Sequence, residues 1–433
     1  MSDQRPTVAI LTLGCKLNQA DSEAIARRLV SDGTRVVDRP LPGADAYVIN
    51  SCSVTHVAER KARHLARQAR RLSPGAPVVL TGCYAETAPP EIAARTGADL
   101  ILRNSEKPSI PDRLLARLAQ RGDPAAGCPA PVQSGLRTRA FIKIQEGCNE
   151  MCAFCIVPYT RGRERSVPVS EVVDEVLKRQ TEGVLEVVLT GTQLGNYGRD
   201  LGWLEPGPRP LLEALLERTS VPRIRLSSLQ AQDISAPLLA LWSDPRLCPH
   251  FHLPLQSGSD AILRRMRRRY SAAEYRQAVE MIRERVPEAA VTTDVIAGFP
   301  GETEADFLAT LRLSQEVGFA AVHAFPYSRR PGTGANNLGE QLPPPVKRSR
   351  LEQLLAVGQA SAEEFRRRFL GRTLPVLWEQ QKGESWQGLT ANYIRVYTSA
   401  DEDLANRIRP TRLLALEGDG VAGQTVRIPA HSL

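Results

Sequence analysis

The sequence lacks any apolar run of the roughly 18 residues that a membrane-spanning helix needs. Its start, MSDQRPTVAILTLG, also lacks the charged-then-apolar layout of a secretory signal. We therefore expect a cytoplasmic protein. Disulfides are rare in that reducing compartment, so the eight cysteines are expected to be metal ligands or inert thiols and not a disulfide framework.

Acidic residues are outnumbered by basic ones. The chain has 48 Asp and Glu against 56 Lys and Arg, a formal net charge of +8 and a pI of about 9.2. This balance favours a polyanionic partner, although many basic proteins bind nothing in particular. With 433 residues the chain is too long for one ordinary core, and typical domain sizes suggest about three units.

Three cysteines stand at C-x3-C-x2-C spacing in residues 148–155, CNEMCAFC, directly after the alternating run AFIKIQEG. Thiolates are the ligands that iron-sulfur clusters and zinc select. The loop lacks a fourth cysteine, whereas a closed zinc site needs four protein ligands. Three thiolates on a four-iron cluster leave one iron open, so the spacing predicts an open cluster at Cys148, Cys152 and Cys155. A zinc loop completed by a distant histidine, or buried cysteines without metal, are the alternatives.

Three more cysteines each follow a predicted strand in the first third of the chain. Strand-like runs alternate there with helical patterns, which indicates βαβ units on a parallel sheet. Ligands bind at the carboxyl edge of such sheets, so Cys15, Cys52 and Cys83 are predicted to converge on one cluster. Buried cysteines at strand ends are the alternative. Cys128 and Cys248 fit no pattern and are interpreted as incidental.

A basic helix is predicted within residues 54–72, VTHVAERKARHLARQARRL. Arg60, Arg63 and Arg67 recur at spacings of three to four and share one face. Such a stripe is usually a solvated face. With the positive net charge, contact with RNA phosphates is the functional alternative.

Several stretches resemble a known family. LGCKLNQADSEA, NSCSVT and TGCYAE resemble the amino-terminal domain of the methylthiotransferases, which are radical S-adenosylmethionine (SAM) enzymes with a second cluster. The wording C-K-x-N-Q at 15–19 resembles the branch that acts on N6-threonylcarbamoyladenosine in tRNA. The resemblance implies two [4Fe-4S] clusters, one binding SAM at Cys148, Cys152 and Cys155 and an auxiliary one at Cys15, Cys52 and Cys83.

Six strand-like segments alternate with helical patterns after a Pro/Gly-rich linker near 121–136. They predict an open partial (βα)6 barrel with its chemistry at the carboxyl ends of the strands. LTGTQLG follows the second strand, where radical SAM enzymes hold the methionine part of SAM. Gly191 permits close backbone approach, and Thr190 and Thr192 offer hydroxyls. A tight turn without a ligand is the alternative.

Three other segments resemble the family's remaining SAM-binding motifs: LSSLQAQD, LQSGSD and DVIAGFPGET. The first departs from the family, because Gln230-Ala231 stands where Glu-Pro is common. Glutamine keeps hydrogen bonding but loses the charge. The resemblance implies SAM contacts at Ser228, Gln256, Ser257, Asp294 and Gly298.

The carboxyl-terminal segment changes to short strand-like runs after a long helix from about 346 to 370. These runs predict a small antiparallel β-barrel, which resembles in position and length the RNA-binding TRAM module. Arg395 lies between Tyr393 and Tyr397 and is a candidate for stacking on bases. A plain packing barrel is the alternative. Arginines in ILRRMRRRY and RGRERS are expected to add positive charge around the open face of the partial barrel.

The sequence therefore predicts an α/β fold of three domains: 6–118 with the auxiliary cluster, 134–368 as radical SAM core, and 369–433 as TRAM-like module. By resemblance, the predicted function is methylthiolation of N6-threonylcarbamoyladenosine at position 37, beside the tRNA anticodon. The expected partners are tRNA, a reduced electron donor and a sulfur donor. Two alternatives keep the reaction but change the substrate, to isopentenyladenosine or to a ribosomal-protein aspartate. A third alternative is a non-catalytic iron-sulfur protein that binds RNA or senses redox state.

Overall fold

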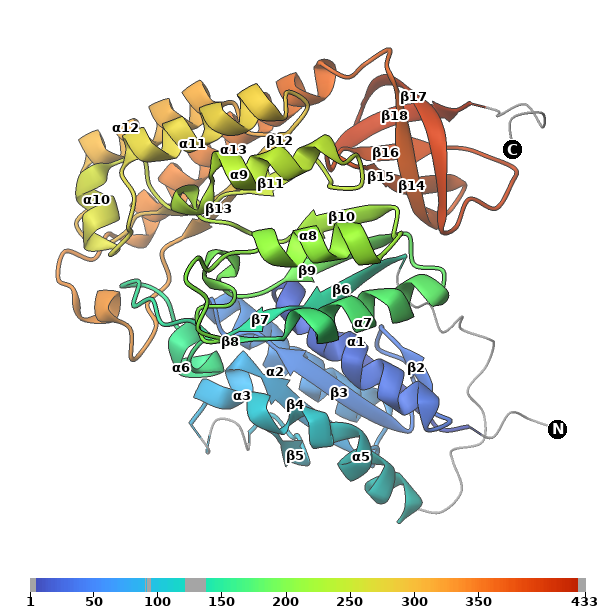
Figure 1. Cartoon of the computed structure of the whole chain (residues 1–433). Helices are drawn as coiled ribbons and strands as arrows, with labels where there is room; N and C mark the ends of the chain where they lie inside the picture. The colour runs from blue at the N-terminus through green and yellow to red at the C-terminus, as the bar shows by residue number, and fades with distance from the viewer. Residues whose placement is uncertain (1–4, 90, 92–94, 121–137, 427–433) are drawn as a thin grey trace. The chain divides into compact units, whose positions relative to one another are not determined.

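The computed structural model describes residues 5–89, 91, 95–120 and 138–426 (Figure 1). The predicted linker near 121–136 and Cys128 lie outside these residues. Among them, no helix is long and apolar enough to cross a membrane.

The chain forms two compact units that cut across the three predicted domains. The first unit holds the described residues before 121 together with Glu146–Glu164 and Ser328–Asn336, and the second holds the rest. The cluster loop at 148–155 thus belongs to the amino-terminal unit, although its flanking strands belong to the other. The predicted domain boundaries themselves stay a prediction.

A five-stranded parallel sheet forms the first unit, with strand order β2-β1-β3-β4-β5. Its strands are β1 (Thr7–Thr12), β2 (Arg35–Val37), β3 (Ala46–Ser51), β4 (Val78–Gly82) and β5 (Leu100–Ile101). Its helices are α1 (Lys16–Ser31), α2 (His56–Leu72), α3 (Cys83–Thr87), α5 (Ile110–Ala119) and α6 (Val157–Arg161), with a 3-10 turn at Asn104–Ser109.

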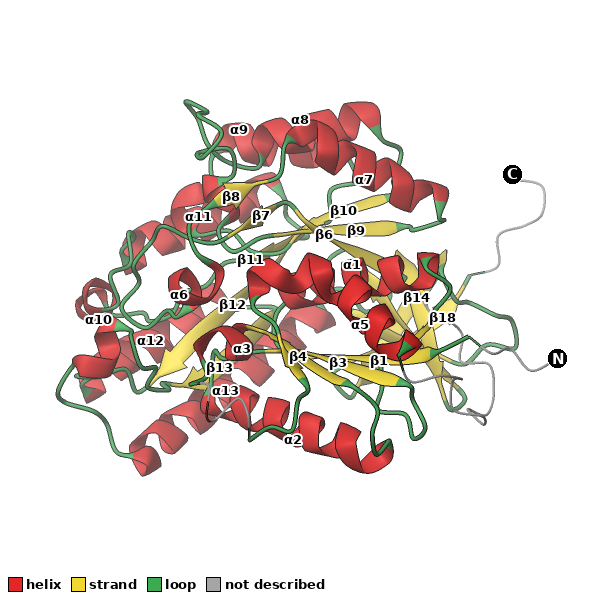
Figure 2. Ribbon diagram, turned by 90° about the horizontal axis from the view of Figure 1, so that it is seen from below, coloured by secondary structure: helices red, strands yellow, loops and turns green. Residues whose placement is uncertain are grey.

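Both faces of this sheet are covered, because side chains alternate along each strand. Val8 and Ile10 of β1 pack with α1 and α5, whereas Ala9 and Leu11 pack with α2. Figure 2 shows α2 on one side of the sheet and α1 and α5 on the other. The helix α2 has alanines at its buried positions, so it lies close to the strands.

The second unit contains the predicted six parallel strands, in two three-stranded sheets of order β10-β9-β6 and β11-β12-β13. A parallel bridge between Ile224 and Leu247 links them. The strands are β6 (Arg139–Lys143), β9 (Glu186–Thr190), β10 (Arg223–Leu226), β11 (His250–His252), β12 (Ala290–Ala297) and β13 (Ala321–Pro326). Two short strands, β7 (Gln145–Glu146) and β8 (Arg165–Ser166), border the cluster loop in sequence.

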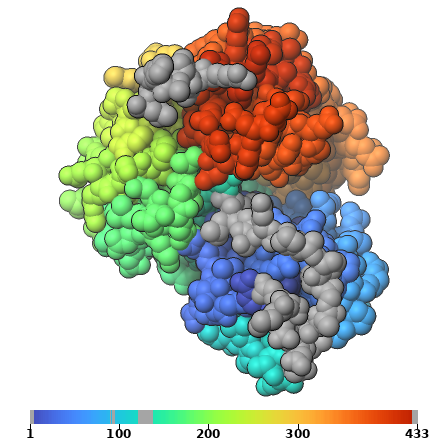
Figure 3. Space-filling view, turned by 90° about the vertical axis from the view of Figure 1, so that its right-hand side faces the viewer, coloured from blue at the N-terminus to red at the C-terminus, as the bar shows by residue number. Residues whose placement is uncertain are grey.

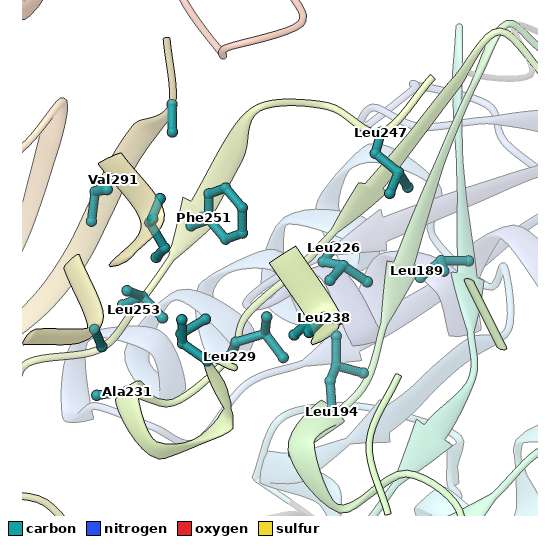
Figure 4. Close-up of a cluster of buried hydrophobic side chains, with 14 of the residues drawn as sticks. Leu189, Leu194, Leu226, Leu229, Ala231, Leu238, Leu247, Phe251, Leu253 and Val291 are labelled. Atoms are coloured by element: carbon teal, nitrogen blue, oxygen red, sulfur yellow. The ribbon is translucent and has the colours of Figure 1, made fainter. Parts of the chain in front are cut away.

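Helices pack outside these strands around one apolar core. They are α7 (Val169–Thr181), α8 (Arg209–Arg218), α9 (Ala236–Leu239), α10 (Asp260–Arg265), α11 (Ala272–Arg285), α12 (Glu304–Val317) and α13 (Pro344–Arg367). Figure 4 shows part of this core, including Leu226 of β10, Phe251 of β11 and Leu238 of α9. The core confirms the predicted partial barrel.

The carboxyl-terminal strands close into the predicted barrel, in the order β14-β15-β16-β18-β17. One expectation was wrong: β16 and β18 pair in parallel, so the barrel is not purely antiparallel. Trp378 and Trp386 fill its interior, and Figure 3 shows its outer surface in red. The strands are β14 (Thr373–Lys382), β15 (Ser385–Thr390), β16 (Arg395–Thr398), β17 (Arg407–Glu417) and β18 (Gly420–Thr425).

Candidate functional site

The cysteine triad of the first unit lies at one edge of its sheet. Cys15 follows β1 and caps α1, Cys52 follows β3, and Cys83 begins α3 directly after β4. These three strands are neighbours and parallel, so their carboxyl ends meet. Gly14 approaches Cys52 so closely that a β-carbon on it would lie 2.9 Å from the Cys52 Sγ atom. Only glycine fits beside that sulfur.

The chemistry of this triad fits a metal cluster. Burial raises the pKa of Cys52 to about 11, and the neighbouring thiols of Cys83 and Cys15 raise it as well. Such a group does not ionise at neutral pH unless a cation replaces its proton. Iron supplies that positive charge, so the three thiols suit a bound cluster better than they suit free thiolates. Their role as ligands stays a prediction.

The loop of Cys148, Cys152 and Cys155 presents backbone donors to its sulfurs. The Glu150 amide donates to Cys148 Sγ at 3.3 Å, and the Val157 amide donates to Cys155 Sγ at 3.4 Å. Hydrogen bonds of this kind stabilise cluster thiolates and tune their potential. All three thiols are partly exposed, which suits a cluster that must admit a further ligand.

Two contacts within the first unit fix the shape of this loop. The Glu164 carboxylate accepts hydrogen bonds from the Asn149 amide and side chain, at 3.3 and 3.2 Å. The Ala335 amide donates to the Ala153 carbonyl at 2.6 Å. The segment Ser328–Asn336 is therefore part of the loop's support, although it lies far away in sequence. Sequence reasoning missed it, because no local pattern marks such a contact.

Arg161 is a buried residue whose role the sequence did not indicate. It was expected to add surface charge as part of RGRERS, but its side chain is 2% exposed. The guanidinium pairs with Asp21 at 3.2 Å and Glu146 at 2.8 Å. Burial lowers the pKa of Arg161, but Asp21 and the thiols of Cys83 and Cys15 raise it by more than burial lowers it. The guanidinium therefore stays charged. Arg161 thus joins the cluster loop to the edge that carries the auxiliary triad.

The predicted methionine-binding turn after β9 is held by a residue that sequence reasoning missed. Gln145 Oε1 accepts hydrogen bonds from the backbone amides of Thr192 and Gln193, at 2.9 and 3.0 Å. A β-carbon on Gly191 would lie 2.7 Å from Leu194 Cδ2 and 3.0 Å from Gln145 Cβ. Thr190 is buried at the end of the strand.

Two buried hydroxyls near this edge fit a polar ligand. Within the described part of the second unit, Thr192 Oγ1 and Ser227 Oγ are buried and have no hydrogen-bond partner. Buried polar atoms in folded proteins are nearly always paired, and an exception calls for a ligand or water. The neighbouring Ser228 is half-buried. These atoms suit the predicted SAM site, and the individual contacts stay predictions.

The LQSGSD segment is strained at Gln256. This residue has a φ of 64°, a left-handed conformation that is uncommon for a non-glycine residue. Its amide donates to the Asp294 carbonyl at 2.8 Å. The hydroxyl of Ser257 lies 3.3 Å from Thr310 Oγ1 and accepts from the Ser259 amide at 3.2 Å. Ser257 therefore already uses its hydroxyl within the fold, while Gln256 is held in place through its backbone.

Asp294 lies on the strand β12, and Gly298 lies in the loop directly after it. Gly298 has a φ of 73°, and a β-carbon on it would lie 2.6 Å from Lys347 Cγ. The Asp294 carboxylate is close to the rings of His252 and His323. Burial raises the Asp294 pKa, but hydrogen bonds from both imidazoles outweigh that effect and hold it below its ordinary value. Neither histidine was predicted as a site residue.

The arginines predicted to contact RNA differ in how exposed their side chains are and in whether they have partners within the protein. Arg60 and Arg67 are exposed on α2. Arg63 instead donates to the Tyr84 hydroxyl at 3.2 Å. Arg395 pairs with Asp419 at 2.5 Å, and the Tyr393 ring stacks on His250 with centroids 4.5 Å apart. Arg395 and Tyr393 thus each have a partner within the second unit, and the role of Arg395 in stacking on bases stays a prediction.

Cys248 is interpreted as a structural thiol. It is fully buried, and burial raises its pKa to about 11. A thiol with that pKa is neutral at physiological pH and unreactive, which agrees with its incidental assignment.

Six parallel βα repeats with a three-cysteine loop define a radical SAM fold. A family model described as the Radical SAM superfamily matches residues 142–314, and one described as Uncharacterized protein family UPF0004 matches residues 7–103. Among solved structures, the radical S-adenosylmethionine methyltransferase TsrM from Kitasatospora setae is 15% identical, with a TM-score of 0.55, over 76% of this chain and 75% of that one. This likeness supports the fold alone.

Curated relatives cover nearly the whole chain. The threonylcarbamoyladenosine tRNA methylthiotransferase MtaB of Bacillus subtilis (strain 168) is 35% identical over 98% of this chain and 97% of its own length. The tRNA-2-methylthio-N(6)-dimethylallyladenosine synthase of Dictyoglomus thermophilum is 34% identical over 96% and 98%. The chain belongs to the radical SAM methylthiotransferase family.

Proposed function

We propose that the chain converts N6-threonylcarbamoyladenosine at position 37 of tRNA to its 2-methylthio derivative. The observation that carries this proposal is the presence of two cysteine triads in a chain that aligns with 97% of the length of an MtaB enzyme. One triad sits in an open loop with amides aimed at its sulfurs, and the other lies at a sheet edge.

The reaction replaces a hydrogen on C2 of adenine, a carbon with no acidic proton. General acid and base groups are therefore poorly suited to it, and cofactor chemistry is required. A [4Fe-4S] cluster bound to the chain would supply the one-electron reduction of SAM on which such radical chemistry depends. We assign its ligands as Cys148, Cys152 and Cys155. This assignment needs an external reduced electron donor, because the chain itself provides no source of electrons.

The remaining site residues are assigned either to the auxiliary cluster, which handles sulfur, or to the binding of SAM. Cys15, Cys52 and Cys83 are assigned to the auxiliary [4Fe-4S] cluster where sulfur from an external donor is carried, and a second SAM provides the methyl group. Binding of SAM is assigned to the buried hydroxyls and turns described above. These are Thr190, Gly191, Thr192, Ser228, Gln256, Ser257, Asp294 and Gly298.

The proposal also specifies which modified adenosine in tRNA is the substrate. Sequence identity alone does not separate the alternatives, because relatives named for the threonylcarbamoyl and the dimethylallyl adenosines differ by only one to three percentage points. The C-K-x-N-Q wording at 15–19 favours the threonylcarbamoyl branch. Mass spectrometry of tRNA nucleosides from a deletion strain, with and without this chain restored, tests the choice. A gain of the dimethylallyl product alone would contradict it.

Cluster assignment is tested by two triple variants that serve as controls for each other. Alanine at Cys148, Cys152 and Cys155 should abolish 5′-deoxyadenosine formation with dithionite and SAM, and should remove about half of the iron. Alanine at the other triad should spare SAM cleavage but abolish methylthiolation. Full iron content in either variant would contradict the two-cluster assignment. Absence of SAM cleavage in the intact, cluster-loaded protein would instead favour the non-catalytic iron-sulfur protein.

A further inference from the structure

Two histidines and one aspartate share a face of the sheet β11-β12-β13. His323 is the register partner of Asp294, and His252 is the partner of Thr292. Since Thr292 and Asp294 are two residues apart on β12, they project to the same side. Val291 and Val295 project to the other side, into the apolar core. The strands β11, β12 and β13 are neighbours (Figure 1). Their register therefore brings these polar side chains together on the face away from that core.

Each histidine of this triad lies about as far from one oxygen of Asp294 as two ligands of one metal ion lie from each other. His252 Nε2 lies 3.4 Å from Asp294 Oδ2, and His323 Nδ1 lies 3.3 Å from Asp294 Oδ1. These hydrogen bonds are longer than the roughly 2.7–2.9 Å that is usual for charge-assisted N–H···O bonds. Around a first-row metal with bonds of about 2.0–2.1 Å, adjacent ligand atoms stand about 2.8–3.0 Å apart in an octahedral site and about 3.3–3.4 Å apart in a tetrahedral site. One ligand atom from each residue lies within 4.8 Å of the others.

The surroundings of His252 orient its ring for this role. Its Nδ1 lies 3.0 Å from Thr292 Oγ1, which in turn lies 3.3 Å from His250 Nε2. Metal-bound histidines are commonly oriented by such a bond at the second ring nitrogen. The open side is formed by His323, whose side chain is 55% exposed, and by Asp294, which is 33% exposed. An ion there retains room for a further ligand.

We propose that His252, Asp294 and His323 bind one divalent first-row transition-metal ion. Two imidazoles and a carboxylate suit Zn²⁺, Fe²⁺ or Mn²⁺. They differ from the thiolates assigned to the clusters. Three protein ligands leave at least one position for water or an oxygen ligand. The site shares Asp294 with the proposed SAM contacts, but its test measures metal binding without SAM or tRNA, so the failure of one proposal can be told from the failure of the other.

The test uses the full chain with both clusters reconstituted without oxygen, because empty cysteine sites would capture the probe. The protein is treated briefly with EDTA, desalted, and incubated with Zn²⁺ or Mn²⁺ in separate arms. Retained zinc is measured by mass spectrometry. Binding of manganese is followed by loss of the six-line electron paramagnetic resonance signal of the free ion. The variants are His323→Ala and His252→Ala, with His64→Ala as control, since His64 is exposed on α2.

The intact protein and the His64→Ala variant should bind one equivalent of ion beyond the cluster iron. His323→Ala should weaken binding by roughly 100-fold, since even outer-shell partners of metal ligands are worth 10–100-fold. Unchanged cluster iron and melting temperature would show that this exposed substitution leaves the fold intact. The proposal is overturned if the intact protein binds neither ion, or if His323→Ala binds as tightly as the control. The triad is then a hydrogen-bonded network without metal.

Discussion

At the scale of single residues, Arg161 shows most clearly that the place of a side chain in the fold decides its role. Arg163, two residues later, is exposed, whereas Arg161 is buried between Asp21 and Glu146. Lys107 also contacts Asp21, at 2.6 Å. One buried carboxylate thus holds two cations, and loss of Arg161 leaves Glu146 without this partner.

Substitution Arg161→Met should therefore destabilise the first unit by about 3–5 kcal/mol, the usual cost of breaking a buried pair. The expected readouts are a lower thermal unfolding midpoint and reduced cluster iron after reconstitution. Arg163→Met is the matched control and should leave both unchanged. Equal behaviour of the two variants would mean that the ion pairs of Arg161 do not support this unit.

Gly191 offers a second test at this scale. A methyl group there meets Leu194 Cδ2 at 2.7 Å, and Leu194 is fully buried. Gly191→Ala should destabilise the packed turn by about 1–3 kcal/mol, the usual cost of overpacking, and the displaced turn should bind SAM more weakly. Equilibrium binding of SAM to cluster-loaded protein measures this effect. Gly339→Ala is the control, because a β-carbon at Gly339 meets nothing within 4 Å.

At the scale of elements, α2 presents its exposed arginines to solvent along one face. Arg60 and Arg67 have no ion pair or hydrogen bond to the described residues, whereas Arg63 and Arg70 are tied to their own unit. Arg60 and Arg67 are therefore the two fully exposed members of the three predicted phosphate contacts, and all three contacts stay predictions. Contacts of this kind contribute salt-dependent affinity that is largely independent of sequence.

Reversing both charges, Arg60→Glu with Arg67→Glu, should weaken tRNA binding and reduce the slope of log affinity against log salt by about 2. Cleavage of SAM without tRNA should be unaffected. Arg218→Glu with Arg312→Glu makes the same change in net charge at exposed positions on α8 and α12. If both double variants lose affinity equally, α2 is ordinary solvated surface.

At the scale of the whole molecule, the terminal barrel is built into the second unit through buried arginines. Arg225 pairs with Glu186 at 2.8 Å and donates to the Ala391 carbonyl at 2.9 Å. Arg223 donates to the carbonyls of Leu389 and Pro375, at 3.0 and 2.6 Å. Burial raises the pKa of Glu186, but Arg225 outweighs this effect and lowers it, so the carboxylate stays charged.

Removal of the barrel would expose these arginines, so a truncated chain cannot separate RNA binding from folding. A point substitution is the sharper test. Arg225→Met should destabilise the second unit by about 3–5 kcal/mol and lower SAM cleavage and tRNA turnover together. Arg218→Met on the exposed end of α8 is the control. If Arg225→Met lowers tRNA turnover alone, the barrel acts separately from the core.

The sequence by itself determined the order of elements and the places of the cysteines. The alternation of side chains in strands and the periodicity of helices are local properties, so residues close in sequence reveal them. Cys15, Cys52 and Cys83 follow three strands, and parallel strands end at the same edge. Their convergence could therefore be predicted before any contact was known.

Only the tertiary structure decided which polar side chains are buried and what they meet. Arg161 and Arg163 stand in the same basic run, yet one is buried beside Asp21, 140 residues away in sequence. Asp294 was predicted from its motif, but His252 and His323 reach it from other strands. Burial and charge pairing depend on residues far apart in the chain, and folding alone brings these residues together.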